Sequence, residues 1–269
     1  MQERSGLLQS LAVGVLAGFL SGLFGVGGGI LIVPALVMLL GMPQRLAHGT
    51  SLAAAVPISA VAALGFAVEG AVEPAVAALV LTGSALGVVA GTYLLTVLPQ
   101  RALRWTFVAI LVITAARLLL AETQGAPVSL DPPVIVGAVL LGVVTGVLSG
   151  LLGVGGGIVM VPAFVVAFGM SDLVAKGTSL FVVVPTALVG TWRNRGHGNV
   201  RLDVAVPVGL AGAVCAYGGV AVATRLDPRV SVALLAALLV VIAVRLVLED
   251  RAETRKERAA QRPSRRRVD

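Results

Sequence analysis

The residues of this sequence with the clearest chemical potential are two clusters of glycine. Each places four glycines within five positions of an otherwise apolar segment: Gly25, Gly27, Gly28 and Gly29 in the first, and Gly153, Gly155, Gly156 and Gly157 in the second. Glycine adopts positive φ freely and weakens helices, so each cluster predicts a break in a helix. The free N–H groups of the break and the amino terminus of the next helix can bind an anion. The alternative is that these glycines only allow helices to pack closely.

A basic residue and two hydroxyls follow each cluster at the same spacing, as His48-Gly49-Thr50-Ser51 and as Lys176-Gly177-Thr178-Ser179. We expect each motif to open a long helix, where hydroxyls and a cation bind an oxyanion through charge-assisted hydrogen bonds. The alternative is that the hydroxyls cap their own helix while the basic side chain extends to the membrane surface. The candidate anion ligands outside the glycine clusters are Thr50, Ser51, Lys176, Thr178 and Ser179.

Other chemistry finds little support in this sequence. Ser21 and Ser149 have no His or Lys at a catalytic spacing, so we do not expect an enzyme. Two histidines and a single cysteine, with no carboxylate cluster, predict neither a metal site nor a cofactor. The glycine clusters lack the Lys-Ser/Thr of a P-loop and the strand–helix context of a dinucleotide-binding turn. No proton relay inside a membrane is expected, because Glu69, Glu73, Asp172 and Asp203 fall at the ends of apolar segments.

The composition is that of an integral membrane protein. Hydrophobic residues make up 58% of the 269 residues and charged residues 12%, and the mean hydropathy is +1.01. A soluble domain is closer to 45–50% apolar and about 25% charged. The segments are apolar on every face, which favours helices over the alternating strands of a membrane barrel. The net charge of +7 does not indicate a nucleic-acid partner, because basic residues concentrate in the tail 249–269.

The chain is an internal duplication. Residues 14–57 align without gaps to residues 142–185, 128 positions later, with 26 identities in 44 positions. The sequence therefore divides into a first repeat (7–120), a polar linker (121–132), a second repeat (133–248) and the basic tail (249–269).

Each repeat contains the same series of apolar segments. We expect helices over 7–24, 29–41, 47–66, 74–97, 102–120, 133–152, 157–169, 175–192, 202–224 and 229–248. The segments 29–41 and 157–169 have thirteen residues each, about 20 Å of helix, which is too short for a hydrocarbon core of about 30 Å. They are predicted to be halves of broken or re-entrant pairs.

The distribution of charges predicts the topology. With both termini in the cytoplasm, most basic loops and the tail lie inside, and the tail contacts anionic lipid headgroups. Each repeat then crosses the membrane an odd number of times, so the two repeats must be inverted relative to each other, as in many secondary transporters. The predicted fold is an all-α polytopic membrane protein made of an inverted repeat, with about four to five transmembrane or re-entrant helices in each half.

The doubled G-x-x-x-G-x-x-x-G-x-x-G-V-G-G-G-x-x-x-V-P block, followed by G-T-S and a helix proline, resembles the TauE/SafE sulfite-exporter family of membrane permeases. The resemblance covers about 7–248. It implies that the glycine clusters and the Thr-Ser pairs belong to a translocation core for a small anion, such as sulfite or an organosulfonate, in the bacterial cytoplasmic membrane. A secondary transporter is therefore the leading hypothesis. The alternatives are a passive anion channel and a non-transporting membrane scaffold or assembly factor.

Overall fold

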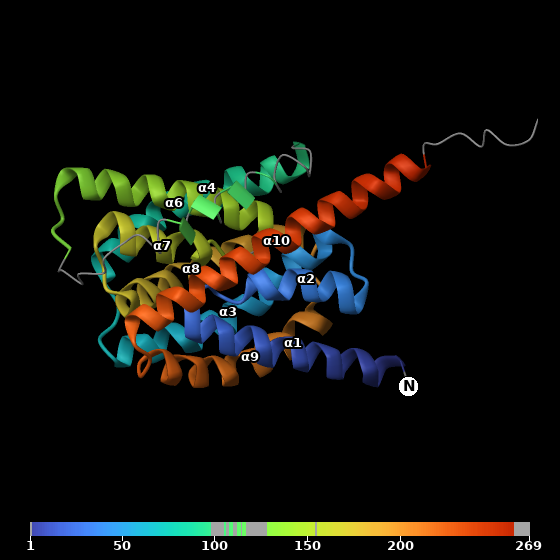
Figure 1. Cartoon of the computed structure of the whole chain (residues 1–269), viewed down its shortest axis with the longest axis horizontal. Helices are drawn as coiled ribbons and strands as arrows, with labels where there is room; N and C mark the ends of the chain where they lie inside the picture. Colours follow the sequence, from blue (N-terminus) through green and yellow to red (C-terminus); the bar gives the residue numbers. More distant parts are fainter. Residues whose placement is uncertain are drawn as a thin grey trace, which may run out of the picture.

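The computed structural model describes residues 2–97, 128–153 and 155–260, together with 105, 108–109, 112–113 and 115–116. Within these ranges the chain forms α-helices and no strand, in the arrangement shown in Figure 1. The helices are α1 (Gln2–Phe24), α2 (Gly29–Leu40), α3 (Gln44–Val68), α4 (Pro74–Val97), α6 (Pro132–Leu152), α7 (Gly157–Phe168), α8 (Asp172–Gly196), α9 (Leu202–Ala223) and α10 (Pro228–Ala260).

The helix boundaries repeat along the chain as the duplicated sequence does. Helices α2 and α7 have 12 residues each and begin at Gly29 and Gly157, which are 128 positions apart. The same shift relates both ends of α3 to both ends of α8. Every positive-φ glycine among the described residues of one half also has a counterpart 128 positions away in the other half. The same local signals therefore start and stop the helices in both halves.

Seven helices of the described part are long and apolar enough to span a membrane, within α1, α3, α4, α6, α8, α9 and α10. Helices α2 and α7 are too short, because 12 residues rise only about 18 Å. Each short helix ends at a left-handed glycine, Gly41 or Gly169, whose N–H bonds back to the carbonyl of Leu36 or Phe164. The predictions of an all-α membrane fold and of two short helical segments are confirmed.

Glycine faces join the outer helices of the two halves. Along α1, Gly14, Gly18 and Gly22 face Val208, Gly212 and Ala216 of α9, so the residue numbers rise together and the two helices are parallel. Helices α4 and α6 pack in the same way, with Gly83 facing Val139 and Gly91 facing Val147. Figure 1 shows these two parallel pairs on opposite sides of the molecule, with α3 and α8 between them.

The two central helices cross in opposite directions. Gly190 of α8 packs on Leu52 of α3, and Gly177, near the start of α8, packs on Phe66, near the end of α3. Because α3 and α8 occupy equivalent positions in the two repeats, this antiparallel contact is the one that an inverted repeat requires. The arrangement is compatible with the predicted inversion.

Some boundaries differ from those expected. Helices α3 and α8 begin three residues earlier than predicted, because the chain turns at Gly41 and Gly169. At the start of α8, the Ser171 hydroxyl also accepts a hydrogen bond from the N–H of Val174. Helix α10 continues to Ala260, since no proline or glycine interrupts it after residue 248. Most of the predicted helix 102–120 and most of the linker 121–132 lie outside the described residues. The division into repeats, linker and tail stays a prediction.

Candidate functional site

Both glycine clusters interrupt the helical chain as predicted. Helix α1 ends at Phe24, and Gly25, Gly27 and Gly28 have φ of 74°, 79° and 74° before α2 begins. The equivalent glycines, Gly153, Gly155 and Gly156, have φ of 68°, 80° and 80°. Residues with a side chain rarely adopt these φ values, so the backbone conformation of each break requires glycine at these positions. No side chain caps the amino end of α2 or α7, where the residue before the helix is Gly28 or Gly156.

The two breaks meet in the middle of the molecule. A Cβ built on Gly157 would lie 2.8 Å from the carbonyl oxygen of Val26, so the start of α7 touches the first break. A Cβ on Gly27 or on Gly155 would lie 2.9 Å from the same atom, Cγ1 of Val183 near the middle of α8. The amino ends of two half-length helices therefore converge, and both carry the partial positive charge of a helix terminus.

Each break also passes against the basic position of the opposite half. A Cβ on Gly25 would lie 2.6 Å from Cα of Lys176, and one on Gly153 would lie 2.6 Å from the carbonyl oxygen of His48. The glycine clusters and the motifs His48–Ser51 and Lys176–Ser179, which are separate in sequence, are thus brought together in space. Their common neighbourhood is the candidate site.

Lys176 is completely buried and paired. Its Nζ lies 2.7 Å from Oδ2 of Asp172, one helical turn earlier, and donates a hydrogen bond to the hydroxyl of Ser231 in α10. Asp172 was expected at a span end without a role in the membrane interior. It is the first residue of α8, yet only 5% of its side chain is exposed. The i, i+4 spacing of Asp172 and Lys176 was the available signal for this pair, whereas nothing local in the sequence points to Ser231.

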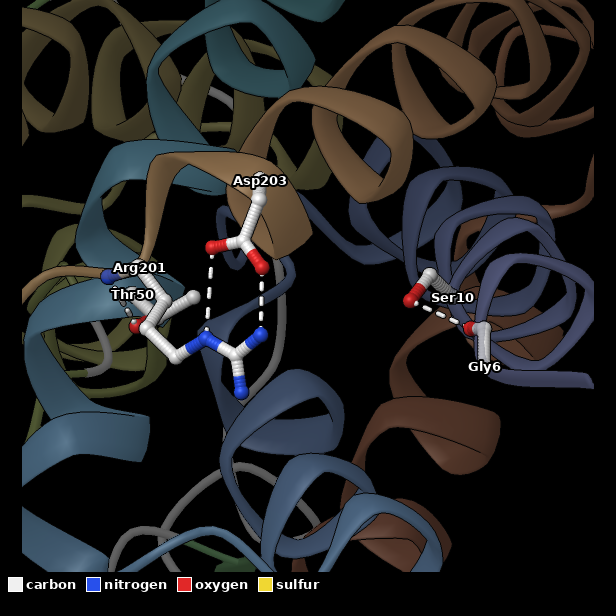
Figure 2. Close-up of polar contacts among 5 residues, drawn as sticks. All are labelled: Gly6, Ser10, Thr50, Arg201 and Asp203. Atoms are coloured by element: carbon white, nitrogen blue, oxygen red, sulfur yellow. Dashed lines mark hydrogen bonds and ion pairs between the residues drawn. The ribbon is translucent and has the colours of Figure 1, made fainter. Parts of the chain in front are cut away.

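The threonines of the two motifs join the halves. Thr50 Oγ1 accepts a hydrogen bond from the backbone N–H of Arg201 at 3.0 Å, and Thr178 Oγ1 accepts one from the N–H of Glu73 at 2.9 Å. Figure 2 shows the first of these bonds, beside the exposed ion pair of Arg201 with Asp203. Because Arg201 and Glu73 directly precede α9 and the start of α4, each threonine anchors a helix of the other half. The alternative that these hydroxyls cap their own helices is wrong.

The serines of the motifs differ from each other. Ser179 Oγ donates a hydrogen bond to the carbonyl oxygen of Gly25 at 3.0 Å. The equivalent hydroxyl of Ser51, although completely buried, has no hydrogen-bond partner among the described residues. The same is true of Ser21, Ser149 and Ser59, where Ser59 Oγ lies 3.2 Å from the position of a Cβ on Gly27. Three of these unsatisfied hydroxyls, those of Ser21, Ser149 and Ser59, lie next to a glycine break, and each can donate to a ligand.

A basic cavity opens near the end of α8. Its volume is about 640 Å³, and it is lined by Trp192, Arg193, Arg195, Gly196 and His197. This end of α8 packs against the amino end of α3, since a Cβ on Gly49 would contact Asn194 and Asn199. The cavity is thus on the His48 side of the molecule. Within the described ranges, no three His, Cys, Asp or Glu side chains group closely enough to hold a metal ion.

Comparison with known proteins agrees with this architecture. The family described as "Sulfite exporter TauE/SafE" matches residues 2–118 and 138–268. A probable membrane transporter protein of Bacillus subtilis, YunE, is 25% identical over 264 residues, which cover 89% of this chain and 96% of that protein. One from Xylella fastidiosa is 30% identical, with coverage of 82% and 86%, and one from Haemophilus influenzae is 32% identical, with coverage of 65% and 68%. No solved structure matches the chain significantly. The chain is a multi-pass membrane protein and belongs to the TauE/SafE family of membrane transporters.

Proposed function

We propose that this protein is a secondary transporter that moves a small anion, sulfite or an organosulfonate, across the bacterial cytoplasmic membrane. The observation that carries the proposal is the meeting of the two glycine breaks, where α2 and α7 begin side by side with uncapped amino ends. Each helix amino end is equivalent to roughly half a positive charge. Two such ends, with backbone N–H groups exposed by glycine, favour an anion over a neutral or cationic solute.

The surrounding side chains suit the same ligand. Lys176 and Ser179 lie beside the first break, where Ser179 bonds to Gly25 and Lys176 supplies an ammonium group. Ser51 offers a buried hydroxyl with no partner among the described residues, while Thr50 and Thr178 hold the helices around the site in place. In the proposed site the glycines of both clusters supply the backbone contacts. The charge of Lys176 is balanced by Asp172, so an anion that binds Lys176 must compete with that carboxylate.

The proposed orientation places both termini in the cytoplasm. It puts Arg193 and Arg195, and with them the basic cavity, on the cytoplasmic side, in agreement with the excess of basic residues expected in cytoplasmic loops. The basic tail would then contact anionic lipid headgroups, where each Lys or Arg near the surface contributes about 1 kcal/mol.

The test is anion flux in proteoliposomes. Purified protein is reconstituted, and the uptake of radiolabelled sulfite, thiosulfate, sulfate and a sulfonate is measured against protein-free vesicles. We expect saturable flux of at least one sulfur oxyanion, and a higher rate when the same anion is preloaded on the opposite side. Flux without saturation or exchange would indicate a channel, and no flux of any of these anions would favour the scaffold alternative.

A further inference from the structure

One face of α3 carries polar groups at helical spacing. His48, Ser51 and Ser59 lie at positions i, i+3 and i+11 with Ala55 between them, which places them on one side of the helix. All are buried, with exposures of 7%, 0% and 0% for the three polar side chains. Among the described residues, Nδ1 of His48 and the hydroxyls of Ser51 and Ser59 have no hydrogen-bond partner.

The equivalent face of α8 is different. Lys176 is bonded to Asp172 and Ser231, and Ser179 is bonded to Gly25. The positions that correspond to Ala55 and Ser59 are Val183 and Ala187, which have no polar side-chain atom. The two equivalent faces thus differ, because the donors on the α8 face have partners whereas the hydroxyls of Ser51 and Ser59 do not. Packing alone does not explain this difference, because buried polar groups are normally hydrogen-bonded.

From this asymmetry we infer that the face of α3 formed by His48, Ser51 and Ser59, here called the α3 track, is the surface along which the anion moves. The inference rests on the proposed function and deepens it by naming Ser59 as the anion contact at the central site. The hydroxyls of Ser51 and Ser59 are donors, and an oxyanion supplies the acceptors that they lack.

The two ends of the α3 track fit this role. His48 lies against the second glycine break at Gly153, and the Ser59 hydroxyl faces the first break at Gly27. Eleven residues of helix separate them, about 16 Å along the axis. At its His48 end, the α3 track begins on the side of the molecule where Arg193 and Arg195 line the basic cavity. Positive charge at such an entrance raises the local anion concentration.

Transport kinetics test the inference. Ser59→Ala and Ser51→Ala are compared with wild type for concentration-dependent sulfite flux in proteoliposomes. We expect Ser59→Ala to raise the half-saturation concentration about tenfold or more, as the loss of one hydrogen bond to a charged group does. The matched control is Ser10→Ala, because Ser10 is also a buried helix serine but donates to the carbonyl oxygen of Gly6 in its own helix (Figure 2). Ser10→Ala is expected to leave the half-saturation concentration unchanged.

Cysteine labelling gives a second measurement that does not need transport. In a Cys215→Ala background, Ser51→Cys is expected to react with a small, negatively charged thiol reagent, whereas Ser10→Cys and Ala187→Cys are not. The two arms separate the hypotheses. Saturable sulfite flux that is unchanged by Ser59→Ala and Ser51→Ala overturns the α3 track and leaves the proposed function standing. Absence of flux in wild type overturns the function, and an unreactive Ser51→Cys then overturns the α3 track as well.

Discussion

Ser179 Oγ donates a hydrogen bond to the carbonyl oxygen of Gly25, 3.0 Å away and 154 positions earlier in the chain. The corresponding contact in the other half would join Ser51 to Gly153, but the Ser51 hydroxyl has no partner in the part of the chain that is described. One glycine break is therefore bonded to the helix of the opposite half and the other is not. In this respect the two halves of the internally duplicated molecule are not equivalent.

This difference predicts unequal effects of two equivalent substitutions. Ser179→Ala is expected to lower the free energy of unfolding by about 1–2 kcal/mol, because it removes a buried hydrogen bond and leaves the Gly25 carbonyl unpaired. Ser51→Ala removes no hydrogen bond and is expected to leave stability within about 0.5 kcal/mol of wild type. Thermal unfolding of the purified protein in detergent measures both. Equal losses of stability in the two variants would contradict this difference in hydrogen bonding between Ser179 and Ser51.

The glycine breaks predict a requirement for transport. Gly28→Leu and Gly156→Leu are expected to abolish sulfite flux, because both positions have positive φ and both are crowded. A Cβ on Gly156 would lie 2.9 Å from the carbonyl oxygen of Thr145, and a Cβ on Gly28 would already lie 3.4 Å from Ala17 and Ile32, which leaves no room for the rest of a leucine. The matched control is Gly41→Leu, at φ 61° with no atom within 4 Å of its Cβ position. The Gly41→Leu variant therefore suffers only backbone strain, about 1–2 kcal/mol, without a steric clash, and it should keep measurable flux. Normal flux in Gly28→Leu and Gly156→Leu would remove the breaks from the mechanism.

The buried ion pair predicts that a single substitution is worse than a double one. Lys176→Gln leaves the Asp172 carboxylate buried and uncompensated, a loss of about 3–5 kcal/mol in comparable pairs. Replacing both, as Lys176→Met with Asp172→Leu, is expected to restore most of that stability. The measurement is thermal unfolding of both variants and of wild type.

Kinetics of Lys176→Gln then test its proposed contact with the anion. We expect the half-saturation concentration of sulfite to rise about tenfold, as charge-assisted hydrogen bonds are worth about twice neutral ones. A variant that is less stable but saturates at the wild-type sulfite concentration would place Lys176 in the fold alone. Normal transport of a neutral analogue by wild type would contradict the anion assignment itself.

The threonine contacts predict additive losses of stability. Thr50→Val and Thr178→Val each replace the acceptor of a backbone N–H with a methyl group, at a cost of about 1–2 kcal/mol. The double variant should lose the sum, because the two bonds are separate and share no partner. Thr82→Val is the control, since the exposed Thr82 hydroxyl bonds only within its own helix, to the carbonyl of Leu79. No difference between Thr50→Val and Thr82→Val would show that the contact contributes little.

Much of the helical architecture could be predicted from the sequence, because its signals are local and occur twice. The breaks at Gly25 and Gly153 and the short helices after them follow from glycine content and segment length. The bond from Arg201 to Thr50 could not be predicted, since it joins residues 151 positions apart through a backbone N–H that any residue supplies. Ser59 was missed for another reason. Its counterpart is Ala187, so the comparison of the two repeats, which singled out the other candidates, passes over it.

The pairing of α1 with α9 has a consequence for the order in which the molecule assembles. The glycine face of α1 packs on Val208, Gly212 and Ala216, which are synthesised about 190 residues later. At about 5–20 residues per second, this interval lasts roughly 10 to 40 s. During that time α1 is in the bilayer with its glycine face against lipid. The corresponding interval between the synthesis of α4 and that of its partner α6 is shorter. The first half therefore cannot reach its final packing before the second half is inserted, and biogenesis of the protein is completed only at its carboxyl-terminal helices.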